Sequence, residues 1–380
     1  MTQFEDIRPY DDSEAQQVLT ELASDPMFAS VVGKLYSQPG AKEHILKLMP
    51  HIQSIEEFQK EVIYPLIVKI EKNTTNGITF SKMEQFQTEG RYLFISNHRD
   101  IILDSAFLNA MMHKHGFSKT EIAIGDNLLI FDWIKKLARL NRTFIVKRSL
   151  GIRDQLKASH TLSDYIRYAI ISKNESVWIA QREGRTKDGN DQTQQALLKM
   201  LNMSNKKNII EGFKELNIVP MAISYEIEPC GISKVEELLN RKYNENFSKT
   251  QQDDLHSMAS GVMLPKGRVH FGFGNPLNIK IDALTEGKNN NEVIQAITHF
   301  IDQRIYFNYK LWPNNYIAAD LLHQTIKYQQ HYTSEQKESF ILRMENDAAS
   351  LSFNHDEIVE MYLKMYANPV INFERFFGNG

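Results

Sequence analysis

The residues of this sequence best suited to chemistry are one histidine and two aspartates that follow it closely: His98, Asp100 and Asp104. A neutral imidazole can take a proton from a hydroxyl group, and a carboxylate can fix the tautomer of the ring and stabilise the charge that forms. Either aspartate can be that partner. The alternative is a surface loop in which Asp104 only caps the helix expected from Ser105.

The triplet His98-Arg99-Asp100 also occurs in the catalytic loop of protein kinases. A kinase needs an asparagine further along that loop, where this sequence has Ser105. No glycine-rich phosphate loop precedes the triplet, and no Asp-Phe-Gly follows it. We therefore exclude a kinase.

A basic segment between residues 135 and 153 contains no acidic residue. Its basic members are Lys135, Lys136, Arg139, Arg142, Lys147, Arg148 and Arg153. Lys147 and Arg148 directly follow an expected strand, and basic groups at the carboxyl end of a strand suit a bound phosphate. An anionic lipid surface is a second use for the same charge. A solvated helix face is the ordinary alternative.

A second charged segment also follows an apolar run. It consists of Gln181, Arg182, Glu183, Gly184, Arg185, Thr186 and Lys187. Its basic side chains can surround a phosphate. Glu183 can orient Arg185 or accept a hydrogen bond from a substrate hydroxyl, and Gly184 allows a close approach of the backbone. The alternative is an ordinary charged turn.

Six apolar runs of strand length alternate with amphipathic segments in the middle of the chain. The runs are Tyr92–Ser96, Glu121–Ile124, Thr143–Val146, Ser176–Ala180, Ile218–Ile223 and Arg268–Phe273. This alternation predicts an α/β fold with a largely parallel or mixed central sheet flanked by helices. Sites in such sheets lie beyond the carboxyl ends of the strands, where His98 and the charged segments occur.

Helical additions are expected on both sides of this α/β unit. We divide the chain into an N-terminal helical region, residues 1–79, the α/β domain, residues 80–283, and a C-terminal helical region, residues 284–380. In the first region, an apolar face from Ile55 to Ile70 indicates a helix that Pro65 should kink or split. In the last region, helices are expected near residues 292–308, 316–329, 334–350 and 355–366.

Composition narrows the class of protein. A hydrophobic content of 42% and a charged content of 24% are typical of a globular chain with a sizeable core. The net charge of -3 does not indicate nucleic-acid binding. One cysteine, Cys230, fits a reducing compartment and is expected to be a structural thiol. The N-terminal residues lack a signal-peptide pattern, and no run approaches the ~18 apolar residues of a membrane span.

Taken in order, these segments resemble the glycerol-3-phosphate and 1-acylglycerol-3-phosphate acyltransferases over about residues 80–277. The four blocks that carry the resemblance are Asn97-His98 to Asp104, Thr143 to Arg148, Glu183-Gly184-Arg185-Thr186, and the strand Ile218 to Ser224 with its Pro220. The family has its aspartate one position earlier, where this sequence has Leu103. Asp104 is favoured over Asp100 because an apolar run follows it, as in the family.

The resemblance implies transfer of a fatty acyl group from acyl-CoA or an acyl carrier protein. The acceptor would be a hydroxyl of glycerol 3-phosphate or of its monoacyl form, in phospholipid synthesis. His98 would act as the base, with Asp104 or Asp100 as its partner. The implied substrate-binding residues are Lys147, Arg148, Arg182, Glu183, Gly184, Arg185 and Thr186. No metal and no bound cofactor are implied.

Such a protein would be cytoplasmic and peripheral on the inner face of the membrane, with its terminal helices forming a lid or a membrane platform. Two alternatives stay open. One is acylation of another lyso-lipid or of an amino-lipid. The other is a non-catalytic module that binds lipid or phosphate, which would keep its binding when His98 is replaced.

Overall fold

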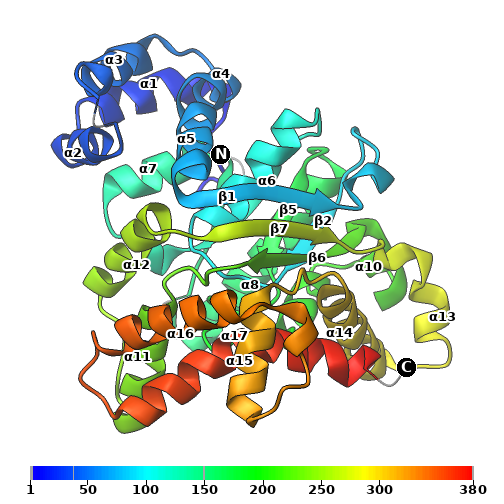
Figure 1. The fold of residues 1–380 in the computed structure, drawn as a ribbon. Coiled ribbons are helices and arrows are strands. Elements are labelled where there is room, and N and C mark those ends of the chain that lie inside the picture. Colours follow the sequence, from blue (N-terminus) through cyan, green and yellow to red (C-terminus); the bar gives the residue numbers. More distant parts are fainter. Residues whose placement is uncertain (1–2, 37, 149, 379–380) are drawn as a thin grey trace.

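The computed structural model describes residues 3–36, 38–148 and 150–378. Its centre is a seven-stranded sheet with the order β1-β7-β6-β2-β5-β3-β4. The strands are β1 (Thr75–Ser81), β2 (Leu93–Ser96), β3 (Thr120–Gly125), β4 (Thr143–Val146), β5 (Ser176–Ala180), β6 (Ile218–Tyr225) and β7 (Gly267–Phe273). Neighbouring strands run parallel except β6 and β7, which are antiparallel. The predicted α/β class with a mixed, largely parallel sheet is confirmed (Figure 1).

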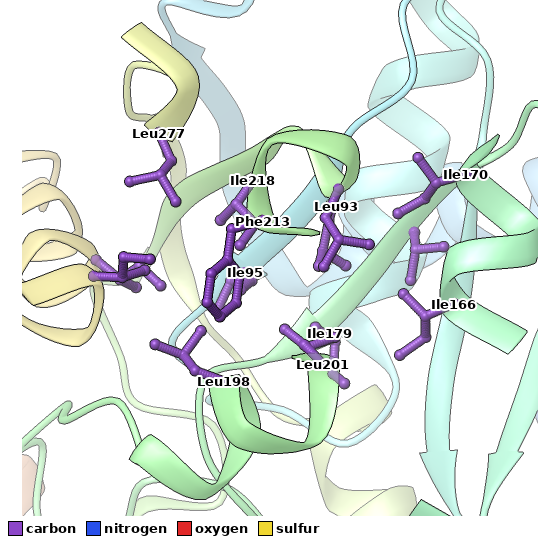
Figure 2. Packing of buried hydrophobic residues seen from close by; sticks show 14 of the residues in the cluster. Leu93, Ile95, Ile166, Ile170, Ile179, Leu198, Leu201, Phe213, Ile218 and Leu277 are labelled. Atoms are coloured by element: carbon purple, nitrogen blue, oxygen red, sulfur yellow. The ribbon is translucent and has the colours of Figure 1, made fainter. Parts of the chain in front are cut away.

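The central strand β2 is buried on both faces of the sheet. Leu93 and Ile95 belong to the apolar core on one face and Phe94 to the core on the other, as the two-residue repeat of a strand requires. Figure 2 shows the first of these cores, whose labelled side chains are Leu93, Ile95, Ile166, Ile170, Ile179, Leu198, Leu201, Phe213, Ile218 and Leu277. Strands covered on both faces need apolar residues at successive positions, which is why apolar runs marked them in the sequence.

Two groups of helices cover the two faces. Those packed on the side of Ile95 are α8 (Ile152–Ile171), α9 (Gln195–Asn202), α10 (Ile209–Leu216), α13 (Ile281–Thr285) and α14 (Asn290–Phe307). Those packed on the side of Phe94 are α5 (Tyr64–Thr74) and α6 (Leu103–Lys114), with α12 (Gln251–Met263) joining through Val262. The site is therefore built on a sheet that is held from both sides.

Two further helical groups have apolar clusters of their own. The N-terminal group is α1 (Asp12–Ala23), α2 (Pro26–Leu35), α3 (Ala41–Leu48) and α4 (Ile55–Phe58), against which α7 (Asp132–Leu140) packs. The second group is α11 (Gly231–Tyr243), α15 (Pro313–His323), α16 (Ser334–Ala348) and α17 (His355–Phe377). Figure 1 shows these two groups at opposite ends of the molecule, with the sheet between them. None of the described helices combines the length and apolar character that a membrane crossing requires.

The sequence did not indicate β1, which spans the predicted boundary between residues 79 and 80. This edge strand pairs only with β7, and much of it is exposed or half-buried. An edge strand of this kind needs no run of apolar residues, so no periodic signal marks it.

Two of the prolines in helical stretches, Pro65 and Pro369, behave differently. A π-helical segment, Gln59–Ile63, separates α4 from α5, and Pro65 is the second residue of α5, so the predicted interruption of the helix is observed. By contrast, α17 continues through Pro369 to Phe377, whereas the predicted helix ended near residue 366. The proline removes the helical partner of the Met365 carbonyl, and the loop before α9 packs against that carbonyl.

Candidate active site

The loops that follow β2 and β5 are joined by backbone hydrogen bonds beyond the carboxyl ends of these neighbouring strands. The Gln181 N–H donates to the Ser96 carbonyl at 2.7 Å, and the Thr186 N–H donates to the His98 carbonyl at 2.9 Å. The third strand, β6, is tied in by Asn97, whose side-chain amide donates to and accepts from the backbone of Ile223 at 2.9 Å and 2.7 Å. Segments far apart in the sequence are thus fixed around His98.

Asp104 is the carboxylate that contacts His98. Its Oδ2 lies 2.8 Å from His98 Nδ1 and also accepts the backbone N–H groups of Arg99 and Asp100, at 2.7 Å and 3.1 Å. Its Oδ1 accepts the hydroxyl of Tyr225 at 2.9 Å. A buried carboxylate with this many donors is held in one position. Because a carboxylate oxygen of Asp104 accepts the hydrogen bond at His98 Nδ1, the neutral ring carries its proton on Nδ1. This leaves Nε2 as the nitrogen that can accept a proton.

Asp100 has a different task. Its Oδ1 accepts the N–H groups of Ile102 and Leu103, at 2.9 Å and 2.8 Å, and so caps the first turn of α6. Burial and the neighbouring charge of Asp104 raise the pKa of Asp100. The capping role that the sequence offered as an alternative for Asp104 therefore belongs to Asp100.

The loop from Gln181 to Lys187 supplies cations to the space beside His98. Arg185 is 8% exposed, and its Nη1 is buried with no hydrogen-bond partner among the described residues. Arg182 Nε is likewise buried and has no hydrogen-bond partner among the described residues. A buried guanidinium nitrogen without a partner is costly, so these two atoms are available to an anionic ligand. Gly184, at a φ of +69°, provides the left-handed turn that places Arg185.

Thr186 and Glu183, the other members of this predicted set, lie differently. Thr186 is fully buried, its backbone N–H donates to the His98 carbonyl, and it does not line the cavity of His98 and Arg185. Glu183 is exposed and lies 3.6 Å from Arg148 Nη1. Lys147 pairs with Asp6 at 3.2 Å. Arg148 and Lys147 nevertheless line the same cavity as His98 and Arg185.

Most of the basic segment is paired within the protein. Lys136 contacts Glu21 and Asp132, at 2.8 Å and 2.6 Å, and Arg142 pairs with Glu175. Arg139 donates to two backbone carbonyls of the N-terminal segment. The segment therefore fastens α7 and β4 to their neighbours, and its free charge is smaller than the sequence indicates.

A cavity of about 2190 Å³ lies beside His98. One part of its wall is polar and contains His98, Lys147, Arg148, Arg182 and Arg185. Another part is apolar and contains Ile63, Leu66, Ile67 and Ile70, Trp133, Ile134 and Leu137 of α7, and Met258 and Val262 of α12. Among the described residues, none beyond Met263 lines the cavity. The N-terminal helices thus contribute to the wall, but the C-terminal helices form no lid over it.

A buried group of charges behind His98 was not predicted. Arg99 Nη2 lies 2.5 Å from Asp191 and Nη1 lies 3.4 Å from Glu228. Lys234 donates to Glu228 at 2.5 Å and to the Arg99 carbonyl at 2.8 Å, and the Tyr309 hydroxyl donates to Asp191 at 2.6 Å. This network joins the His98 loop to the segment before α15. Its members are too far apart in the sequence for any spacing to indicate it.

The C-terminal helix α17 also holds the loop after β5. Asn368 donates to the Asp188 carbonyl at 2.6 Å. A side chain at Gly189 would come within 2.1 Å of the Met365 carbonyl oxygen, and Gly189 has a φ of +73°. Only glycine combines this conformation with so close an approach. The C-terminal region therefore braces the site from behind.

Cys230 is a buried thiol that donates to the Ser257 carbonyl at 3.2 Å. Burial raises the pKa of the Cys230 thiol, the opposite of what a nucleophile needs. No group of His, Cys, Asp and Glu side chains among the described residues could hold a metal ion.

Comparison with known proteins gives one family. Residues 77–224, which include His98, Arg148 and Arg185, match the family model described as Acyltransferase. Among solved structures, the chain is similar to the 1-acyl-sn-glycerophosphate acyltransferase PlsC from Thermotoga maritima, with 11% identity, 76% of this chain and 94% of that chain covered, and a TM-score of 0.35. That likeness is too low to carry an argument. No curated protein matches the chain.

Proposed function

Residues 77–224 form an acyltransferase-family domain, and from this premise we propose that the protein acylates a hydroxyl of glycerol 3-phosphate or of its monoacyl form, in phospholipid synthesis. The donor is a fatty acyl thioester, acyl-CoA or acyl carrier protein. The observation that carries the proposal is His98, with Nδ1 held by the buried Asp104 at 2.8 Å, in the wall of a cavity that is cationic in one part and apolar in another.

The proposed reaction is a direct transfer. His98 Nε2 takes the proton of the acceptor hydroxyl while the hydroxyl oxygen attacks the thioester carbonyl carbon. The tetrahedral intermediate then loses the thiolate, which receives the proton back from the imidazolium. Asp104 stabilises the imidazolium between these two steps. The ester is formed, the thioester is broken and the protein ends in its starting state.

The test of this proposal is an assay of the purified protein. A labelled acyl thioester is offered with glycerol 3-phosphate, with its monoacyl form, and with a lyso-lipid lacking the glycerol phosphate. We expect transfer to one or both glycerol phosphates. Transfer only to the third acceptor would keep the chemistry and change the acceptor, and no transfer to any of them would contradict the proposal.

Arg185→Ala is expected to raise the KM for the phosphorylated acceptor about tenfold and to change kcat little. Charge-assisted hydrogen bonds to a phosphate contribute about 1.5–3 kcal/mol, and a contact made equally in ground and transition states acts on KM. The matched control is Arg153→Ala, because Arg153 is exposed and does not line the cavity. A rise in donor KM with an unchanged acceptor KM would show that the substrates are assigned the wrong way round.

We also propose that the rim of the cavity meets the membrane surface. Exposed apolar side chains stand at this rim, namely Ile102, Leu150 and Met263, and Leu264 follows Met263. Because most of the basic segment is paired internally, apolar contact is the main attraction in this proposal. A lipid acceptor would then reach the cavity without crossing water.

Met263→Ser is expected to weaken sedimentation with phospholipid vesicles about tenfold or more, since burying a methionine side chain in lipid contributes about 1.5–3 kcal/mol. Leu342→Ser is the matched control. Leu342 is 64% exposed and Met263 is 61% exposed, and only Met263 lines the cavity. Equal loss in both variants, or binding abolished by salt alone, would reject an apolar rim as the contact.

A further inference from the structure

Three cations of the cavity wall converge on one buried carboxylate, Glu237. Lys187 Nζ lies 3.1 Å from Glu237 Oε1, Arg241 Nη2 lies 2.9 Å from the same oxygen, and Lys249 Nζ lies 3.1 Å from Oε2. Glu237 is 3% exposed. We call these four residues the Glu237 cluster. Its cations come from three segments: the loop after β5, helix α11 and the turn before α12.

The cluster has more positive than negative charge. Besides Glu237, one further carboxylate among the described residues contacts these cations, namely Asp254, which lies 3.6 Å from Lys249. Asp188 is also in the cavity wall, where its carboxylate accepts the N–H of Asn190 at 3.0 Å. The cationic side chains keep 25%, 52% and 21% of their surface exposed. A buried carboxylate that holds three partly exposed cations together pre-organises them for an anion with several oxygens.

The rise along two helices, α11 and α12, shows how far Glu237 and Asp254 lie from the positions beside Arg185 and Asp100. In α12, a side chain at Gly261 would come within 2.3 Å of Asp100, and Asp254 lies two helical turns before it, about 10 Å away. In α11, Cys230 lies beside Arg185, and Glu237 comes two turns later, again about 10 Å away. Along both helices, Glu237 and Asp254 thus lie about 10 Å from the positions beside Arg185 and Asp100, and Lys187 reaches the cluster from the same loop as Arg185.

This separation distinguishes between the two substrates. In glycerol 3-phosphate the hydroxyl that reacts and the phosphate are only a few bonds apart. A phosphate at the cluster is too far away for that hydroxyl to lie beside His98. In a coenzyme A thioester, by contrast, the pantetheine arm separates the reacting carbonyl from the nucleotide phosphates.

We propose that the Glu237 cluster binds the nucleotide phosphates of an acyl-CoA donor, with the pantetheine arm lying along the cavity toward His98. The proposal rests on the proposed acyl transfer and makes it more specific, because it assigns the donor to a coenzyme A thioester and gives the two substrates separate cationic sites. Arg185 and Arg182 then remain for the acceptor phosphate.

The test compares two alanine variants at neighbouring positions of α11, Arg241→Ala and Lys242→Ala, and uses two acyl donors. Arg241→Ala removes a cation of the cluster, whereas Lys242→Ala removes its neighbour, which is equally exposed at 49%, pairs with Glu357 and does not line the cavity. Each variant is assayed with acyl-CoA and with the same acyl group on pantetheine, which has no nucleotide. We expect Arg241→Ala to raise the KM for acyl-CoA about five- to tenfold and to leave the KM for acyl-pantetheine unchanged. Lys242→Ala should alter neither.

An equal change with both donors, or no change with either, would overturn the proposal. So would a wild-type protein that accepts acyl carrier protein but not acyl-CoA. A measurement of coenzyme A binding by calorimetry separates the two levels of inference. Wild-type binding that weakens in Arg241→Ala supports the cluster even if no transfer is found, and only the proposed reaction then fails. Binding unaffected by Arg241→Ala contradicts the cluster alone.

Discussion

Replacing His98 with alanine is expected to remove nearly all acyl transfer while the protein stays folded. Loss of a general base costs about 10²–10⁴-fold in rate. His98 is half-buried at the end of β2, and the loop around it is held by backbone hydrogen bonds of Gln181 and Thr186 that the variant keeps. Turnover of labelled acyl thioester and the melting temperature of the same preparation measure the two parts of this prediction.

His113→Ala is the matched control, because His113 lines the same cavity and packs its ring against Tyr64. We expect this variant to keep most of its activity. Loss of turnover without loss of acceptor and donor binding in His98→Ala would separate an enzyme from a non-catalytic module. Near-normal turnover of a well-folded His98→Ala protein would contradict the proposed mechanism.

Asp104→Asn is expected to lower kcat by about 10²–10⁴-fold, far more than its effect on stability explains. The new amide can donate to His98 Nδ1, and the ring would then carry its proton on Nε2, where it cannot act as a base. The Tyr225 hydroxyl still finds an acceptor in the asparagine oxygen, whereas the Arg99 N–H donates to the other carboxylate oxygen and would face the new amide group, so some stability is lost as well. The measurement is kcat at saturating substrate beside the unfolding free energy.

Asp100→Asn is the comparison variant for this experiment. An asparagine at position 100 can still accept the N–H groups of Ile102 and Leu103, so the cap is kept and little stability is lost. Activity should therefore fall much less than in Asp104→Asn. The reverse order of activity loss would assign the role of histidine partner to Asp100.

The amino-acid sequence by itself determined the inner strands and the place of the site. Strands such as Thr143–Val146 and Ser176–Ala180 are covered on both faces, so burial requires the apolar runs that mark them. Parallel strands then bring the loops at their carboxyl ends to one edge of the sheet. For this reason His98, Arg148 and Arg185, which are far apart in the chain, were predicted together and line one cavity.

The tertiary structure decided which neighbour each charged side chain has. Asp104 and Asp100 differ little in the sequence, and only the curl of the loop brings Asp104 to His98 and Asp100 to the first turn of α6. The basic segment looked free because its acidic partners, among them Glu21 and Glu175, lie in other parts of the chain. Ion pairs depend on distance in space, which no local spacing encodes.

The same reason applies to the features that the sequence did not reveal. Strand β1 exists because its backbone pairs with β7, about half the chain away, and backbone pairing leaves no mark in residue type. Arg99 finds Asp191 and Glu228 only after β2, β5 and β6 have assembled. The periodicity of apolar residues follows from burial and can be read from the sequence. The partners of polar groups depend on long-range packing and are known only from the folded structure.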